Sequence, residues 1–286
     1  MIEAYLKKRG EITNTVFIEN CGVPAEQISK LIHSFSHALI RRDDYGAWSF
    51  PGSSLFIGYN GRKIALSTIH QLKQKMDVPR NLENVMFSTT MDNQHVVPNS
   101  IFSDESAPEE GLDIALYELP SFATDGKVLC STQFYPLLED RLWPAGAIDD
   151  FMFVCGFPEY VDKQYGPSPT LDYPEWDDKI SDITEANFCT SNVLMSALKI
   201  TNQTRQGFFS AQLLVDGHIC VNGLSGSPIF YIGKNKEGLF LGLAGIVVRG
   251  SCGSKVLNFA PASYVYSIIN SYISLNTDTT DDKTPS

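Results

Sequence analysis

The residues Val221-Asn-Gly-Leu-Ser-Gly-Ser-Pro-Ile-Phe230 form the most informative stretch of the chain. Ser225 stands between Gly223 and Gly226, and a proline and an apolar run follow. Glycines allow backbone conformations and close approaches that a Cβ would obstruct. We therefore expect a tight turn that presents the Ser225 hydroxyl just before a strand. Such a turn can aim the amides of Gly223 and Ser225 at one point, as an oxyanion requires; a plain turn without function is the alternative.

The order of the histidines along the chain limits the serine hydrolases that fit. All five come before the serine: His33, His37, His70, His95 and His218. An α/β-hydrolase places its histidine after the serine, so that class is excluded. A subtilisin-like enzyme would need alternating helices, which the sequence lacks. The order His, Asp, Ser remains, and His70, Asp113 and Ser225 fill it.

The spacing of apolar residues elsewhere indicates a β-rich protein with a helix near each end. Apolar residues recur at helical spacing over 24–36 and 262–275. Between these helices, short β-branched and aromatic runs alternate with turn signals such as Asn60-Gly61, which is typical of a barrel or sandwich. A polar stretch at 159–182 is expected to be a surface loop. The strands expected in the first half are 38–42, 48–58, 63–68, 84–89 and 114–119.

Three motifs resemble those of the chymotrypsin/trypsin-like serine peptidases. Ser67-Thr-Ile-His70 is similar to their Thr-Ala-Ala-His segment, and Asp113-Ile-Ala-Leu116 matches their Asp-Ile-Ala-Leu element. Gly223-Leu-Ser-Gly-Ser-Pro228 resembles their Gly-Asp-Ser-Gly-Gly-Pro. It is closest to the Gly-Asn-Ser-Gly-Ser-Pro form of the bacterial V8-like and HtrA-like branch. The resemblance runs from about residue 38 to residue 275.

The resemblance implies an all-β fold of two six-stranded antiparallel β-barrels (trypsin-like fold), with an N-terminal helix and a C-terminal helix. The first barrel would span 38–140 and carry the histidine and aspartate. The second would span 141–275 and include the nucleophile and the C-terminal helix. Residues 1–37 would be a helical extension, and 276–286 a disordered tail.

The implied activity is that of a serine endopeptidase that works through an acyl-enzyme intermediate. Ser225 would be the nucleophile, His70 its base, and Asp113 the group that orients the imidazole. The amides of Gly223 and Ser225 would form the oxyanion hole.

Two departures from the family pattern lie close to these residues. Leu224 occupies the position where trypsin-like zymogens carry an Asp that pairs with a newly cut N-terminus, so we expect no N-terminal cleavage on activation. Val248 replaces the usual Ser that supports the aspartate, so Asp113 is expected to be less well held. Val248 and the acidic loops at 104–110 and 159–182 leave a second hypothesis open, a pseudoprotease that binds peptides without turnover.

The resemblance also implies a substrate pocket. Ile219 occupies the pocket floor where a trypsin has Asp, and Val247 replaces the His of glutamate-specific V8 enzymes. With Phe259 nearby, we expect an apolar pocket for a medium-sized aliphatic or aromatic side chain. Val248, Arg249 and Gly250 would line the strand that pairs with substrate.

The cysteines favour a reducing compartment. Six are scattered along the chain without a CxxC pair, and we expect most to be buried thiols. Cys220 and Cys252 fall close to the positions of a family disulfide, but two adjacent thiols are the favoured interpretation. With no secretory signal and no apolar stretch long enough to span a bilayer, we expect a cytoplasmic protein.

Charge and the remaining histidines exclude further classes of function. The chain has 22 Lys and Arg against 33 Asp and Glu, a net charge of −11, which argues against nucleic-acid binding. His33 and His37, four residues apart in the expected helix, could bind a metal, but no carboxylate or cysteine completes a site. We expect no metal, no cofactor and no membrane contact. The partner is a polypeptide substrate; a regulatory protein that the helix at 24–36 recruits is a further hypothesis, with simple packing of that helix favoured.

Overall fold

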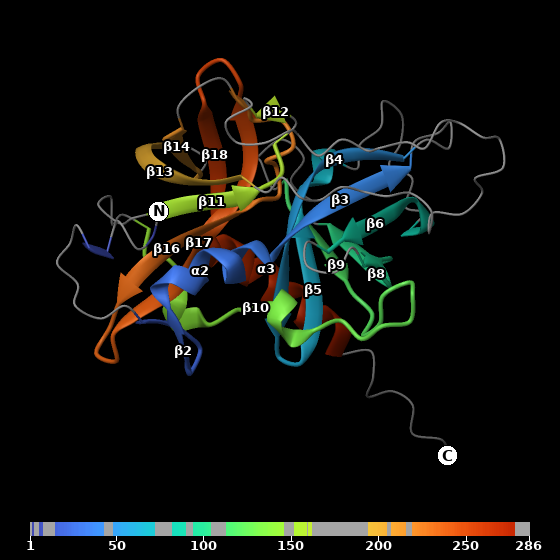
Figure 1. The fold of residues 1–286 in the computed structure, drawn as a ribbon. Coiled ribbons are helices and arrows are strands. Elements are labelled where there is room, and N and C mark those ends of the chain that lie inside the picture. Colours follow the sequence, from blue (N-terminus) through green and yellow to red (C-terminus); the bar gives the residue numbers. More distant parts are fainter. Residues whose placement is uncertain are drawn as a thin grey trace.

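The computed structural model describes residues 2, 6–7, 15–42, 48–71, 82–89, 94–103, 113–145, 152–158, 160–161, 194–204, 207–215 and 219–277. They form two β-sheets that lie side by side, with two helices packed against them (Figure 1). The all-β expectation is confirmed. The loop expected at 159–182 falls outside the described residues except at 160–161.

The first half of the chain forms one curled sheet with the strand order β7-β6-β3-β4-β5-β9-β8. Neighbours in it are antiparallel, and β10 joins β4 in parallel. The strands are β3 (Ser36–Arg42), β4 (Trp48–Tyr59), β5 (Arg62–Ser67), β6 (Val85–Ser88), β7 (His95–Val96), β8 (Ser100–Ser103), β9 (Ala115–Glu118) and β10 (Tyr135–Pro136). Short 3-10 turns lie between them: η1 (Ile69–Gln71), η2 (Leu82–Asn84), η3 (Ser131–Gln133) and η4 (Glu139–Arg141).

The prediction of a closed first barrel is wrong for the described residues. The edge strands β7 and β8 do not pair with each other in the described sheet. They follow one another in the chain, and residues 97–99, which include Pro98, separate them. Because proline has no N–H, it interrupts a ladder at this point. The two edges of the sheet are therefore joined by the chain at 97–99 and not by hydrogen bonds between β7 and β8.

The second half forms the closed six-stranded barrel that was expected. Its ladder runs β11-β13-β14-β18-β17, and β16 closes it by pairing with both β17 and β11. The strands are β11 (Met152–Gly156), β13 (Leu194–Gln203), β14 (Phe209–Leu213), β16 (Pro228–Lys234), β17 (Leu239–Ser251) and β18 (Val256–Pro261). A separate pair, β12 (Tyr160–Val161) with β15 (Ile219–Cys220), leads into the Ser225 turn.

The expectation of a purely helical N-terminal segment is wrong, because this segment contributes two strands to the second sheet. These are β1 (Thr15–Ile18), parallel to β17, and β2 (Cys21–Pro24), antiparallel to β1. Along one edge of β17, β18 pairs only from Gly245 onward. The same edge is open at Leu239 and Phe240, and β1 fills it there.

The helix α2 (Ala25–His33) ends earlier than expected. Ala25, Ile28 and Ile32 form its buried face, at the spacing of an amphipathic helix. The side chain of Ser34 donates to the carbonyl of Leu31 at 2.6 Å, and β3 then begins at Ser36. The apolar face of α2 is therefore occupied by packing against the rest of the fold.

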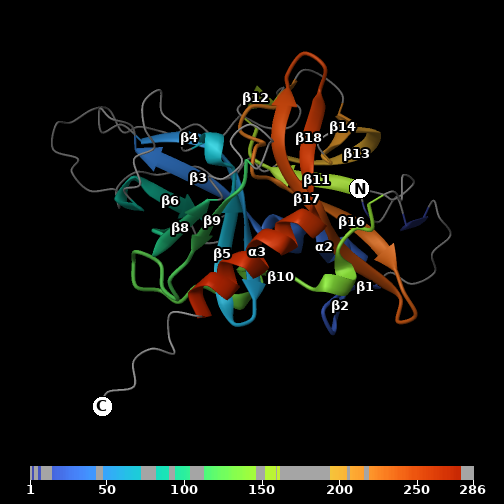
Figure 2. The same cartoon turned by 180° about the vertical axis from the view of Figure 1, so that it is seen from behind.

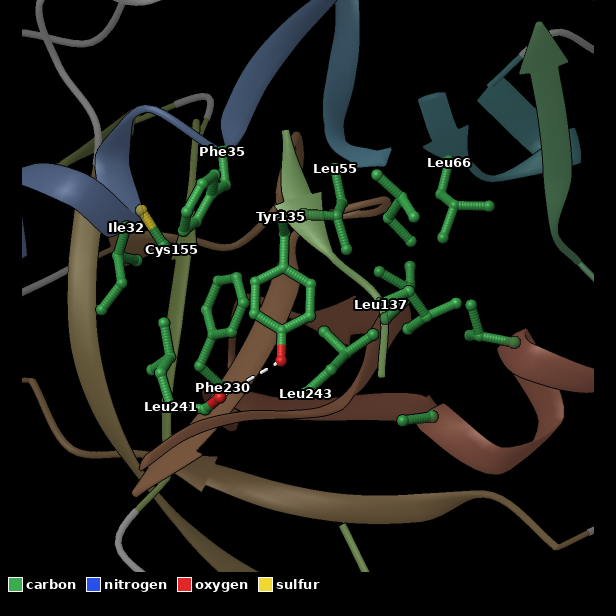
Figure 3. Packing of buried hydrophobic residues seen from close by; sticks show 14 of the residues in the cluster. Ile32, Phe35, Leu55, Leu66, Tyr135, Leu137, Cys155, Phe230, Leu241 and Leu243 are labelled. Atoms are coloured by element: carbon green, nitrogen blue, oxygen red, sulfur yellow. Dashed lines mark hydrogen bonds between the residues drawn. The ribbon is translucent and has the colours of Figure 1, made fainter. Parts of the chain in front are cut away.

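A single apolar cluster fills the space between the two halves (Figure 3). Tyr135 lies near its centre, edge-to-face against Phe35 and Phe230 at centroid distances of 5.6 and 5.2 Å. Its hydroxyl donates to the carbonyl of Leu241 at 3.2 Å. Leu55 and other residues of the first sheet pack there against strands of the second. The two sheets are thus held together by one continuous core.

The C-terminal helix α3 (Ala262–Thr277) lies across both halves (Figure 2). Val265 and Ile269 are buried in the shared cluster. On the side of the first sheet, the hydroxyl of Tyr59 donates to Asn270 Oδ1 at 2.9 Å, and the hydroxyl of Tyr272 donates to Glu118 Oε2 at 2.8 Å. The predicted helix over 262–275 is confirmed and extends to Thr277; residues 278–286 of the expected tail lie outside the described residues.

The cysteines differ from the expectation of buried thiols. Among those described, only Cys155 is buried, in the shared cluster. Cys21 is exposed because it lies in the edge strand β2, and Cys130 is exposed at the start of η3.

Candidate active site

His70 and Asp113 are joined by two hydrogen bonds. His70 lies in η1, directly after β5, and Asp113 lies just before β9, the neighbour of β5 in the sheet. The amide of His70 donates to Asp113 Oδ1 at 2.8 Å, and the ring Nδ1 hydrogen-bonds to Asp113 Oδ2. The side chain of Asp113 is 13% exposed and that of His70 is 41% exposed. Because the acceptor at Nδ1 is a carboxylate oxygen, the ring proton of neutral His70 lies on Nδ1, and Nε2 keeps a lone pair for accepting a proton.

Ser225 lies in the tight turn that the sequence predicted, between β15 and β16. Gly223 and Gly226 have φ angles of +84° and +83°, which L-residues rarely adopt. The turn closes through hydrogen bonds from the amide of Leu224 to the carbonyl of Val221 at 3.1 Å and from Ser227 to Leu224 at 2.9 Å. The glycines are therefore required by the backbone of the turn itself.

The amides of the turn divide into two groups. Those of Leu224, Gly226 and Ser227 are bonded to backbone carbonyls. Those of Gly223 and Ser225 make no backbone hydrogen bond to a described residue. These two amides are the donors that an oxyanion hole would use, and their role in binding an oxyanion stays a prediction.

The turn of Ser225 contacts the first half through its carbonyl oxygen. This oxygen accepts from the amide of Ser53 at 2.9 Å and from Gln71 Nε2 at 2.7 Å. Since Gln71 follows His70 in η1, the Ser225 turn lies beside the histidine turn. The Ser225 hydroxyl itself donates to the carbonyl of Val248 at 3.5 Å. In the described part of the chain, no hydrogen bond joins it to His70.

Gln71 and Ser53 are site residues that the sequence reasoning missed. Both are buried. The Ser53 hydroxyl donates to the carbonyl of Gly223 at 2.7 Å and accepts from the amide of Phe157 at 2.8 Å. The one available signal was the polar Gln71 directly after the histidine motif.

Val248 packs against the core instead of donating a hydrogen bond to Asp113. It is buried in the cluster that also contains Ile114, the neighbour of Asp113. The pairing of β17 with β18 shifts register between Val247 and Arg249, so Val248 lies at a β-bulge. Asp113 is held by the two hydrogen bonds from His70.

The residues expected to bind substrate fall into two groups. Ile219 and Phe259 are packed in the interior of the closed barrel, where Phe259 stacks on Phe209 at 5.6 Å. Arg249 and Gly250 are exposed at the end of β17. A Cβ on Gly250 would lie 2.6 Å from Val221 Cγ2, so these two chain segments are in contact. The role of these residues in substrate binding stays a prediction.

The thiols of Cys220 and Cys252 lie next to each other. Their Sγ atoms are 2.6 Å apart, and Cys252 Sγ donates to Asn222 Oδ1 at 3.7 Å. The pair connects the segment before the Ser225 turn with the turn after β17.

His33 and His37 do not form the helical pair that was considered for a metal. α2 ends at His33, and His37 belongs to β3. The ring of His37 packs at a tilt against Phe56 with 3.7 Å between ring centroids, and its Nε2 hydrogen-bonds to the carbonyl of Gln133 at 3.3 Å. Burial lowers the pKa of His37 to about 3. His95 is half-buried, and His218 lies outside the described residues.

The described residues offer neither a metal-binding cluster nor a membrane-spanning helix. They contain no group of three or more His, Cys, Asp or Glu side chains placed to bind a metal ion. They also contain no helix with the length and apolar character needed to cross a membrane.

Comparison with known proteins identifies the fold. No protein-family model and no curated protein sequence matches the chain. Among solved structures, it is similar to the scabies mite inactivated protease paralogue S-D1, with a TM-score of 0.52 and 10% identity. The match covers 84% of this chain and 92% of that one. Together with the closed barrel and the curled sheet beside it, this likeness shows that the chain has a chymotrypsin-like protease fold.

Proposed function

We propose that the protein is a serine endopeptidase, with Ser225 as nucleophile, His70 as base and Asp113 as the group that orients the base. The observation that carries the proposal is the pair of hydrogen bonds between His70 and Asp113 beside a glycine-flanked serine turn. The sequence of the turn at 223–228 supports a place near the V8-like and HtrA-like branch.

The geometry supports the following steps. The Ser225 hydroxyl rotates from the Val248 carbonyl toward His70 and attacks the substrate carbonyl as His70 Nε2 takes its proton. Asp113 stabilises the imidazolium that forms. The amides of Gly223 and Ser225 donate to the oxyanion. His70 then protonates the leaving amine, and water hydrolyses the acyl-enzyme by the same route.

Leu224 supports an enzyme that is active without N-terminal cleavage. Its side chain is fully buried in the apolar core of the second barrel. A buried leucine holds the turn by packing and needs no charged N-terminus as a partner.

For the substrate, we propose a polypeptide with an apolar side chain before the scissile bond.

Two observations favour a second candidate, a protease fold that binds peptides without cleaving them. The Ser225 hydroxyl points to a backbone carbonyl. The similar solved structure is described as an inactivated protease paralogue.

A fluorophosphonate probe distinguishes the two candidates, because it labels only an activated serine. We expect the wild type to be labelled and Ser225→Ala not to be. Ser227→Ala is the matched control: this serine is equally close to the turn, buried, and its hydroxyl has no hydrogen-bond partner among the described residues. A folded wild type that binds peptides but is never labelled would contradict the enzyme proposal.

A further inference from the structure

The side-chain amide of Gln71 uses all its hydrogen-bonding groups. Nε2 donates to the carbonyls of Ser225 at 2.7 Å and Pro51 at 3.3 Å. Oε1 accepts from the hydroxyl of Ser67 and from the amide of Thr68 at 3.4 Å. The amide has one orientation only, because a flipped amide would set Oε1 against two carbonyl oxygens.

The contact between Gln71 and Ser225 crosses from one half of the molecule to the other. The Gln71 backbone is held in the first half, where its carbonyl accepts from Arg41 Nη1 at 2.8 Å. Its side chain reaches the turn of the second half, where the Ser225 carbonyl also accepts from the Ser53 amide. Both lone pairs of that carbonyl are therefore filled by donors of the first half.

Gly52 leaves the space that the amide occupies. A Cβ at Gly52 would lie 1.6 Å from Gln71 Nε2 and 3.0 Å from the carbonyl oxygen of Ser225. The amide thus fits closely between the backbone of β4 and the Ser225 turn. At 3% exposure, Gln71 is shielded from water, so a lost hydrogen bond here is not replaced by solvent.

We propose that Gln71 is a positioning residue that sets the distance between the His70 ring and the Ser225 hydroxyl. It is the covalent neighbour of the base and the hydrogen-bond partner of the residue that carries the nucleophile. It thus links the two groups without touching substrate. This inference rests on the proposed function and adds to it the residue that fixes the approach of base and nucleophile.

Gln71→Met tests the proposal, because methionine keeps the length of the side chain and removes its hydrogen bonds. We expect fluorophosphonate labelling of the folded protein to slow by about 10- to 100-fold in its maximal rate, with the probe concentration for half-maximal rate unchanged. The matched control is Gln133→Met. Gln133 is also buried, and it bonds the Cys130 amide within its own half. We expect this control to lower Tm without slowing the labelling of folded protein.

Gly52→Ala tests the same contact from the other side. The added methyl group displaces the Gln71 amide, so labelling should slow as in Gln71→Met. Combining the two substitutions should cost less than the product of their separate effects, because both break one contact. Labelling of Gln71→Met at the wild-type maximal rate would overturn the inference and leave the proposed function intact. A wild type that is not labelled would overturn both.

Discussion

Residue 226 needs a glycine for two reasons that can be separated by experiment. Its φ of +83° disfavours any L-residue, and a Cβ would lie 1.9 Å from the carbonyl oxygen of Ser53. Gly61 has a similar φ of +73°, but a Cβ there would meet nothing within 4 Å. We expect Gly61→Ala to lower the free energy of unfolding by about 1–2 kcal/mol. Gly226→Ala should lower it by more than about 3 kcal/mol, because backbone must move. Chemical denaturation measures both, and equal losses would contradict the steric account.

Asp113 is the second residue whose role can be isolated. In Asp113→Asn, the side-chain amide can donate to His70 Nδ1, which places the ring proton on Nε2 and removes its lone pair. We expect the labelling rate to fall by about 10⁴-fold, with little change in Tm. Asp125→Asn is the control, since Asp125 pairs with Lys127 in an exposed turn. A comparable loss in both variants would show that the effect is not specific to the site.

A buried arginine, Arg141, adds side-chain hydrogen bonds to the N-terminal hairpin of β1 and β2. Arg141 donates to the carbonyls of Phe17 at 3.1 Å and Glu19 at 2.9 Å, and it lies over the ring of Phe240. We expect Arg141→Met to reduce the free energy of unfolding by about 2–3 kcal/mol, because it removes the buried side-chain donor of two carbonyls. The ion pair of Arg62 and Glu118, whose side chains are 29% and 30% exposed, supplies the comparison. Arg62→Met should cost no more than about 1 kcal/mol; denaturation curves of both variants check the difference.

The elements differ in how far the sequence could predict them. β4 and β5 were expected almost in full, because long apolar runs flank the strong Asn60-Gly61 turn signal. β1 and β2 were missed, since each has four residues and β1 pairs with a strand more than two hundred residues away. α2 was predicted to be too long because the apolar spacing continues through Phe35. That side chain is buried after the helix has ended.

The candidate site shows the same limit. His70, Asp113 and Ser225 could be proposed from their order along the chain and from the resemblance of three short motifs to those of serine peptidases. Gln71 and Ser53 could not be assigned, because their partners are brought near only when the two halves pack together. Hydrogen bonds that cross between distant segments leave no local pattern in a sequence.

At the scale of the whole molecule, buried histidine makes stability depend on pH. Burial lowers the pKa of His37 to about 3 and also lowers that of His33 and His95. An unfolded chain takes up protons on these rings near pH 6.5, whereas native His37 stays neutral. The contribution of neutral His37 to the free energy of unfolding is therefore fully present above about pH 6.5. It is lost as the pH drops toward 3, by about 1.4 kcal/mol per pH unit.

Denaturation between about pH 7 and about pH 5 measures this slope. We expect His37→Phe, which keeps an aromatic ring against Phe56, to flatten it by the contribution of His37. An unchanged slope would show that His37 is not the group responsible.

The two ends of the chain each cross to the opposite half of the molecule. β1 and β2, at the N-terminus, extend the second sheet, while α3, at the C-terminus, is hydrogen-bonded to the first. Each terminal segment therefore packs on the half that the other end of the chain helps to build, and both segments join the two halves. A cut in the chain between residues 145 and 152 would leave two fragments that still share strands and a core. The protein is thus suited to fragment complementation, in which the native fold returns only when the two pieces recombine.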